Sequence, residues 1–253
     1  MTTDDASDLI ALVRKLGQRT DLDADDIDAI LALPYRNDTC SARRYVVREG
    51  DSSSHGALLL SGFAFSSKLA GDGGRQILSV HVRGDLLGLN SGLLDAVDHN
   101  VQALTPCRIA CIPHYAILAL AEARPAIARA FWREAMVEAS IAREWLLNVG
   151  RRTARQRISH LFCELAARQE AAGVCSGPTY HWPMTQEEVA DALGLTSVHV
   201  NRTLQGLRRD GLLQASAHSV VVADWAALQV EGDFSPSYLH QPAASPDAAS
   251  IAA

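Results

Sequence analysis

Apolar positions recur at helical spacing near the start of the chain, and short apolar runs follow. Residues 7–33 carry leucine, isoleucine and valine three and four positions apart, which predicts helical structure that ends at Pro34. Residues 40–115 hold short apolar or alternating runs between glycines, and tight turns are expected at Gly50, Gly73 and Gly84. The runs are Tyr45–Val47, Ala57–Leu60, Gln76–Val82 and Arg108–Ile112. This pattern predicts an antiparallel barrel or jelly roll.

A long helix is expected after these strands. Pro125 suits a first helical turn, and no further glycine or proline interrupts before Gly150, so residues 125–148 would extend roughly 35 Å. The apolar stripe of this helix packs either on its own domain or on a second copy, and we favour a dimer contact. The predicted contact residues are Ile127, Phe131, Ile141 and Trp145. Glu134 and Glu138 interrupt a clean heptad and leave the register open.

The segment from 184 to 213 has the pattern of two short helices joined by a tight turn. Thr185 and Glu188 predict a capping box at the start of the first helix, and Gly194 permits the bend after it. Thr196 caps the second helix, whose buried stripe consists of Val200, Leu204 and Leu207. Two apolar runs farther on, near 212–214 and 220–222, predict a hairpin or wing. The segment therefore predicts a winged helix-turn-helix.

The outer face of the second helix carries no acidic residue. At about 100° per residue, Val198, Arg202, Gln205 and Arg209 lie opposite the buried stripe. Arginine can pair with guanine and asparagine or glutamine with adenine, so this face predicts base reading in the DNA major groove. The predicted DNA contacts are Ser197, Val198, His199, Asn201, Arg202, Gln205, Arg208 and Arg209. Further phosphate contacts are expected from Arg151, Arg152, Arg155 and Arg157.

Charge and composition restrict the remaining possibilities. The chain is 48% apolar and 21% charged, which is typical of a folded globular protein. Its net charge is −6, but residues 1–28 hold eight Asp against three basic residues, whereas residues 150–211 hold eight Arg against six acids. An anionic partner therefore fits the C-terminal half. We find neither a membrane-length apolar run nor a signal peptide, so a cytoplasmic protein without membrane contact is expected.

The sequence resembles the Crp/Fnr family of bacterial transcription regulators over nearly its whole length. The resemblance lies in the helix-turn-helix and in the phrases Val47-Arg-Glu-Gly-Asp51, Gly74-Arg-Gln-Ile77 and Arg83-Gly-Asp-Leu-Leu-Gly88. It implies an α+β fold with an N-terminal antiparallel β-roll like that of cyclic-nucleotide-binding domains, a long dimerisation helix and a C-terminal winged helix-turn-helix. The expected divisions are 1–34 (N-terminal helices), 35–120 (β-roll), 121–149 (dimerisation helix), 150–232 (DNA-binding domain) and 233–253 (a tail with a disordered end).

The same resemblance implies a transcription regulator, expected as an activator with repression left open, that binds double-stranded DNA as a homodimer. Its operator would be near-palindromic, with half-sites about one helical turn apart, and RNA polymerase would be a further partner. Val198 stands where the family usually has Glu, so the half-site should differ from the well-known ones. The effector and the target genes stay open.

Two differences from the Crp/Fnr pattern lie in the N-terminal half, where the resemblance places effector sensing. The expected effector pocket comprises Gly84, Gly88, Leu89, His99 and Asn100. Members that bind cyclic AMP carry Glu where Leu89 stands and an Arg-Ser pair where His99 and Asn100 stand, so we expect no tight cyclic-nucleotide binding. Cys40 stands alone near the N-terminus, which argues against an iron–sulfur cluster.

The other chemistry-bearing residues form no recognisable site. The second histidine of a cupin-type metal motif is missing, because His81 is followed by Val82 and Arg83. We expect no metal, no cofactor and no catalytic group. Cys107 and Cys111 are expected to be ordinary buried thiols, whereas Cys163 and Cys175 leave open a redox effect on DNA binding. The alternative function is a jelly-roll enzyme or ligand-binding protein whose helix-turn-helix makes protein contacts only.

Overall fold

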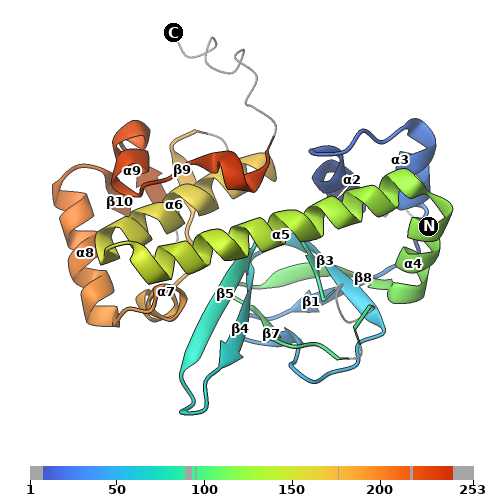
Figure 1. Cartoon of the computed structure of the whole chain (residues 1–253), viewed down its shortest axis with the longest axis horizontal. Helices are drawn as coiled ribbons and strands as arrows, with labels where there is room; N and C mark the ends of the chain where they lie inside the picture. Colours follow the sequence, from blue (N-terminus) through green and yellow to red (C-terminus); the bar gives the residue numbers. More distant parts are fainter. Residues whose placement is uncertain (1–7, 89–92, 95, 176, 217–218, 242–253) are drawn as a thin grey trace, which may run out of the picture.

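The structure is a computed structural model that describes residues 8–88, 93–94, 96–175, 177–216 and 219–241. Leu89 of the expected effector pocket and the expected disordered end, 242–253, lie outside these residues. In Figure 1 the β-roll lies below one long helix, the helical C-terminal domain gathers around the left end of that helix, and the N-terminal helices lie at its right end.

The expected N-terminal helical segment consists of two helices, α2 (Ile10–Gly17) and α3 (Ala24–Leu31). The α3 helix begins with a capping box, in which the side chains of Asp23 and Asp26 each accept a hydrogen bond from the other residue's backbone N–H. The apolar side of α2 packs on the outside of the β-roll, together with α4 (His114–Ala123) and the start of the long helix.

The β-roll consists of two four-stranded sheets with antiparallel pairing throughout. One sheet has the order β1-β8-β3-β6 and the other has the order β2-β7-β4-β5. The strands are β1 (Arg36–Cys40), β2 (Tyr45–Val47), β3 (His55–Ser61), β4 (Ala64–Leu69), β5 (Arg75–His81), β6 (Leu86–Leu87), β7 (Asn100–Ala103) and β8 (Cys107–Pro113). A small apolar core that includes Leu59, Val101 and Ile109 fills the roll. The predicted antiparallel roll is confirmed.

The long helix α5 (Pro125–Arg151) runs past the β-roll to the C-terminal domain. That domain consists of α6 (Ala154–Ala171), β9 (Thr179–His181), α7 (Gln186–Leu193), α8 (Ser197–Arg209), β10 (Leu213–Ala215), β11 (Ser219–Val222), α9 (Trp225–Glu231) and the 3-10 helix η2 (Pro236–Leu239). The wing is a three-stranded sheet in the order β10-β11-β9, because β9 forms inside a segment that the sequence marks only as a break.

The segment from residue 233 to residue 241 packs against the C-terminal domain instead of extending away from it. Phe234 and Leu239 are buried in the core of the C-terminal domain. The Tyr238 hydroxyl donates a hydrogen bond to the buried carboxylate of Glu164 at 2.8 Å. Its ring stacks on His160. The expectation of a tail from residue 233 is therefore wrong for 233–241, because an aromatic and aliphatic cluster anchors this segment on α6.

Candidate functional site

The helix-turn-helix forms as its local sequence predicts. The Thr185 and Glu188 side chains complete the capping box of α7, and Gly194 ends that helix in the left-handed conformation at φ 62°. The Thr196 hydroxyl accepts a hydrogen bond from the His199 backbone N–H at 3.2 Å and so caps α8. Both helix ends of the turn are therefore set by residues within the segment itself.

The face of α8 that points away from the domain core is polar and open. The buried side of the helix consists of Val200, Leu204 and Leu207. Val198 is 77% exposed, His199 is half-buried, and the remaining residues predicted to contact DNA are exposed. These exposed residues are Ser197, Asn201, Arg202, Gln205, Arg208 and Arg209. The face thus offers guanidinium, amide, hydroxyl and methyl groups on one side of a helix at the end of the molecule (Figure 1).

Three of the four arginines around the start of α6 hold the fold together instead of facing outward. Arg152 is buried, and its guanidinium contacts Glu144 at 2.7 Å and Asp233 at 3.0 Å. Arg157 donates hydrogen bonds to the backbone oxygens of Arg152 and Leu193, both at 2.8 Å.

Arg155 forms ion pairs with Asp210 at 2.7 Å and Glu231 at 3.0 Å, and so joins α6 to the end of α8 and to α9. The expectation that Arg152, Arg155 and Arg157 contact phosphate is therefore corrected, because partners from distant parts of the chain bind their guanidinium groups. Arg151 is exposed.

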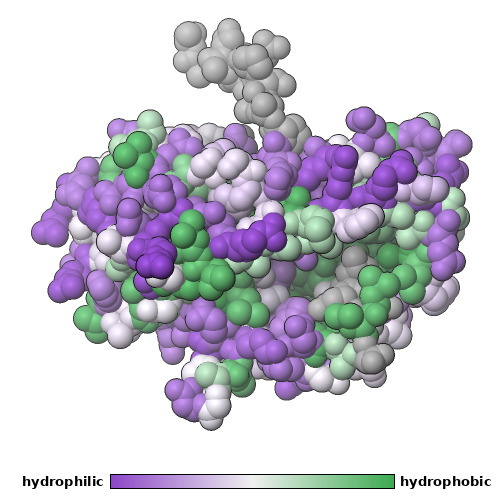
Figure 2. Space-filling view, viewed as in Figure 1, coloured by the Kyte–Doolittle hydropathy of each residue, from purple (hydrophilic) through white to green (hydrophobic). Residues whose placement is uncertain are grey.

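The long helix has two apolar sides, and the residues predicted for the dimer contact lie mainly on the side that faces their own chain. Ile127 and Trp145 are buried in the cores of their own chain. Phe131 and Ile141 pack partly against those same cores. The exposed side instead carries Trp132, Met136, Leu146 and Leu147. Figure 2, which looks onto α5, shows hydrophobic surface along the helix between hydrophilic patches.

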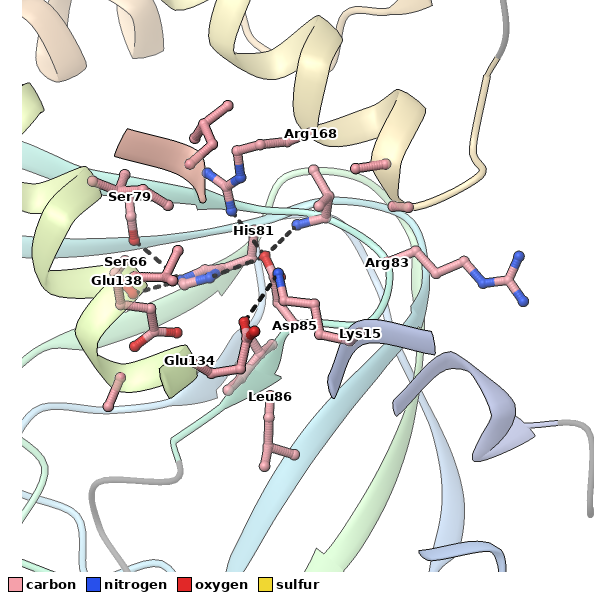
Figure 3. Close-up of a pocket in the computed structure, with 18 of the residues that line it drawn as sticks. Lys15, Ser66, Ser79, His81, Arg83, Asp85, Leu86, Glu134, Glu138 and Arg168 are labelled. Atoms are coloured by element: carbon pink, nitrogen blue, oxygen red, sulfur yellow. Dashed lines mark hydrogen bonds and ion pairs between the residues drawn. The ribbon is translucent and has the colours of Figure 1, made fainter. Parts of the chain in front are cut away.

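A cavity of about 400 Å³ lies where α2, the β-roll, α5, α6 and the C-terminal segment meet. Figure 3 shows Lys15 of α2, His81 at the end of β5 and Arg168 of α6 converging on Asp85, while Arg83 points away. The Asp85 carboxylate contacts Lys15 at 2.8 Å and Arg168 at 2.9 Å. Burial acts to raise the pKa of Asp85, but the opposing charges and hydrogen bonds hold it well below its usual range.

The cavity includes only part of the pocket expected from sequence. Gly88 and His99 line it. Gly84 is not part of the lining; it has a positive φ of 91°, and a Cβ atom there would lie 3.3 Å from the backbone oxygen of Ala11 on α2. The Asn100 side-chain oxygen accepts a hydrogen bond from the Glu49 backbone N–H. The polar groups on the Asp85 side come from elements far apart in sequence, and a short motif could not have indicated Lys15 or Arg168.

Comparisons with known proteins agree with this architecture. Residues 39–124 match the cyclic nucleotide-binding domain family, and residues 156–230 match the Crp-like helix-turn-helix domain family. The transcriptional activator protein FnrL of Cereibacter sphaeroides is 31% identical over 214 residues, which cover 83% of this chain and 85% of FnrL. This chain belongs to the Crp/Fnr family.

One further relative supports that assignment, and one solved structure shares the fold. The nitrogen fixation regulation protein FixK of Azorhizobium caulinodans is 31% identical over 173 residues, which cover 68% of this chain and 69% of FixK. The structure of FixK2 from Bradyrhizobium japonicum has the same fold, with a TM-score of 0.71 at 22% identity over 84% of this chain and 100% of FixK2. The chain is a transcription regulator of the Crp/Fnr type with a helix-turn-helix for binding DNA.

The five thiols of this Crp/Fnr protein are free, and burial makes several of them weak nucleophiles. Burial raises the pKa of Cys163 to about 12, that of Cys107 to about 11 and that of Cys175 to about 11. Cys40 faces Cys107 across the β1–β8 pair. Thiolates at positions 163 and 175 would be scarce at neutral pH, which argues against the redox effect that the sequence left open.

Within the described part of the chain, no cluster of three or more His, Cys, Asp or Glu residues has the arrangement of a metal site. His81 instead bonds the hydroxyl of Ser66 at 2.7 Å. Across the same residues, no helix is both long and apolar enough to span a bilayer.

Proposed function

We propose that this protein regulates transcription as a homodimer that reads a near-palindromic operator, with α8 of each subunit in the major groove. The observation that carries this proposal is the outer face of α8, where Val198, Asn201, Arg202 and Gln205 are exposed and no acidic side chain interrupts. An arginine near the middle of such a face can pair bidentately with guanine. RNA polymerase is the expected further partner.

Phosphate contacts would flank this reading face. A shallow groove lies between the first turn of α6 and α8, lined by Thr153, Arg155, His199 and Arg202 among others. The first turn of this 18-residue helix is closed by the Thr153–Gln156 capping box, and the dipole of the helix still favours an anion near its N-terminus. We therefore place one strand of the duplex along this groove and assign further phosphate contacts to Arg208 and Arg209.

The dimer contact would use the exposed side of α5. Trp132, Ala139 and Leu146 are spaced seven residues apart, and Met136 lies one turn after Trp132. Trp132 is 70% exposed and Leu146 is 71% exposed. A seven-residue apolar repeat is the spacing of a two-helix seam. Glu134 does not disturb this seam, because it forms an ion pair with Arg19, two residues after α2, on another side of the helix.

We propose the cavity beside Asp85 as the place where an effector would act, and we do not expect that effector to be a cyclic nucleotide. His99 bonds the Asp98 carboxylate at 2.7 Å, and this bond lowers the pKa of Asp98. A phosphate placed at His99 would therefore meet a neighbouring negative charge. Calorimetry with cyclic AMP and cyclic GMP tests this, and submicromolar binding of either would contradict it.

Arg202→Ala tests the reading function. A binding duplex is first selected from random DNA with the wild-type protein, and its affinity is compared with that of a scrambled duplex at several salt concentrations. We expect Arg202→Ala to lose about tenfold or more of the preference for the selected duplex while non-specific binding remains. Arg36→Ala, at a 73% exposed side chain on β1 of the β-roll, is the control. An unchanged preference would contradict the assignment, and failure to select any duplex would favour a protein-contact role.

Leu146→Glu tests the dimer seam. The substitution places a charge in the middle of the proposed apolar contact, so we expect the sedimentation profile to shift from dimer toward monomer. Tyr115→Glu is the matched control, because Tyr115 is 72% exposed on α4, away from α5's exposed side. A monomeric wild-type protein, or a dimer that tolerates Leu146→Glu, would remove this part of the proposal.

A further inference from the structure

The outer surface of the β-roll and the core of the C-terminal domain form one continuous apolar cluster. Phe65 on β4, with Ile77 and Val80 on β5, belongs to the same buried cluster as residues of α6, α7 and α8. Burying such side chains stabilises the contact that covers them by about 1.5–3 kcal/mol each. The β4–β5 hairpin is thus packed directly on the helix-turn-helix domain of its own chain.

A β-bulge in the β4–β5 pair places apolar side chains on the surface that packs against the C-terminal domain. Ser66 pairs with Ser79 and Ser67 pairs with Ile77, so Leu78 is the extra residue on β5. In a regular strand, residues three apart face opposite sides. The bulge lets Ile77 and Val80 both turn into the shared core, while Leu78 is 38% exposed.

Polar contacts fix the edge of this surface on α7. The Arg75 guanidinium contacts the Asp191 carboxylate at 2.7 Å and 2.8 Å, and it lies over the Phe65 ring at 5.1 Å. The Gln76 side-chain amide donates to the backbone oxygens of Ala192 at 3.1 Å and Ile77 at 2.9 Å. Arg75 and Gln76 belong to the Gly74–Ile77 phrase, for which the DNA-reading function gives no role.

We infer that Arg75 is a positioning residue for DNA reading: through Asp191 and the shared apolar core, the β4–β5 hairpin orients the helix-turn-helix of its own chain. Figure 1 shows α7 between β5 and α8, so the hairpin contacts the helix-turn-helix on the α7 side and leaves the outer face of α8 exposed. The contact therefore pre-orients α8 without blocking it, and losing it should weaken binding. The consequence for DNA rests on the proposed function, whereas the docking contact itself does not.

A charge-reversal cycle tests this inference. Arg75→Glu, Asp191→Arg and the double variant are compared with Lys68→Glu, which breaks the exposed Lys68–Glu49 pair on the same hairpin without touching α7. One readout is hydrogen exchange of α7 amides in the free protein, and the other is affinity for the duplex selected with wild type. We expect each single reversal to speed exchange in α7 and to weaken binding about tenfold.

The double variant, which restores opposite charges, should recover both readouts to within about twofold, and Lys68→Glu should change neither by more than that. Unchanged exchange in Arg75→Glu would overturn the docking contact. Unchanged or tighter duplex binding, or a double variant without recovery, would overturn the positioning role. If no duplex is selected at all, the proposed function fails, and exchange in α7 still decides whether the docking contact exists.

Discussion

Two groups of arginines in the C-terminal domain show how differently one residue type is used. On α8, Arg202 and Arg209 are exposed on the outer face. Around α6, Arg152 and Arg168 are buried against carboxylates that come from other parts of the chain. The outer group is available to DNA, whereas the inner group joins α6 to α5, to the β-roll and to the C-terminal segment. Arginine density alone therefore does not locate a DNA contact.

The largest expected loss of stability comes from Asp85→Asn, which removes the carboxylate that pairs with the buried Arg168. Removing this charge leaves Arg168 and Lys15 without their shared carboxylate, so we expect the free energy of unfolding to fall by about 3 kcal/mol at pH 7. Urea denaturation measures it. Asp21→Asn, at an exposed position, is the control and should change stability by less than about 0.5 kcal/mol.

The pH dependence sharpens that test. The pKa of Asp85 is held well below its usual range in the folded protein, so the unfolded state binds the proton first as pH falls. The stabilisation is fully present above the ordinary aspartate pKa of about 3.9 and is lost as pH falls below it toward the folded pKa. The difference between wild type and Asp85→Asn should shrink over that window. A difference that stays constant down to pH 3 would contradict the role of the charge.

A smaller loss of stability is expected from Arg152→Ala. Its guanidinium contacts Glu144, which is largely buried, and Asp233, which is exposed, so we expect about 2 kcal/mol. Arg209→Ala is the matched comparison and should leave stability within about 0.5 kcal/mol. Equal losses in thermal or urea denaturation would show that the division into inner and outer arginines is wrong.

Among the paired arginines around α6, the smallest effect on stability is expected from Arg155→Ala. Its side chain is about one-third exposed and pairs with Asp210 and Glu231, so solvent screening limits the loss to about 1 kcal/mol. Because the guanidinium already has two carboxylate partners, the preference for the selected duplex should change less than threefold. If Arg155→Ala lost as much of the preference for the selected duplex as Arg202→Ala does, Arg155 would have to be counted among the DNA contacts.

The sequence predicted most accurately what depends on neighbouring residues. The capping box at Thr185, the turn at Gly194 and the buried stripe of α8 all occur as predicted. The antiparallel roll and the long helix were also predicted, because glycine spacing and helical periodicity are local signals. The sequence did not reveal that Tyr238 anchors the C-terminal segment on Glu164, since that contact spans 74 positions.

By itself, the sequence determined the order of the main parts, the helix-turn-helix and the composition of the outer face of α8, because backbone propensity, caps and periodicity act within a few residues. Only the tertiary structure decided which side of α5 stays open and which arginines are buried. It also decided that Lys15, Asp85 and Arg168 meet beside one cavity. Those outcomes depend on which distant surfaces the fold brings together, and an amphipathic stripe or a charged side chain does not encode the identity of its partner.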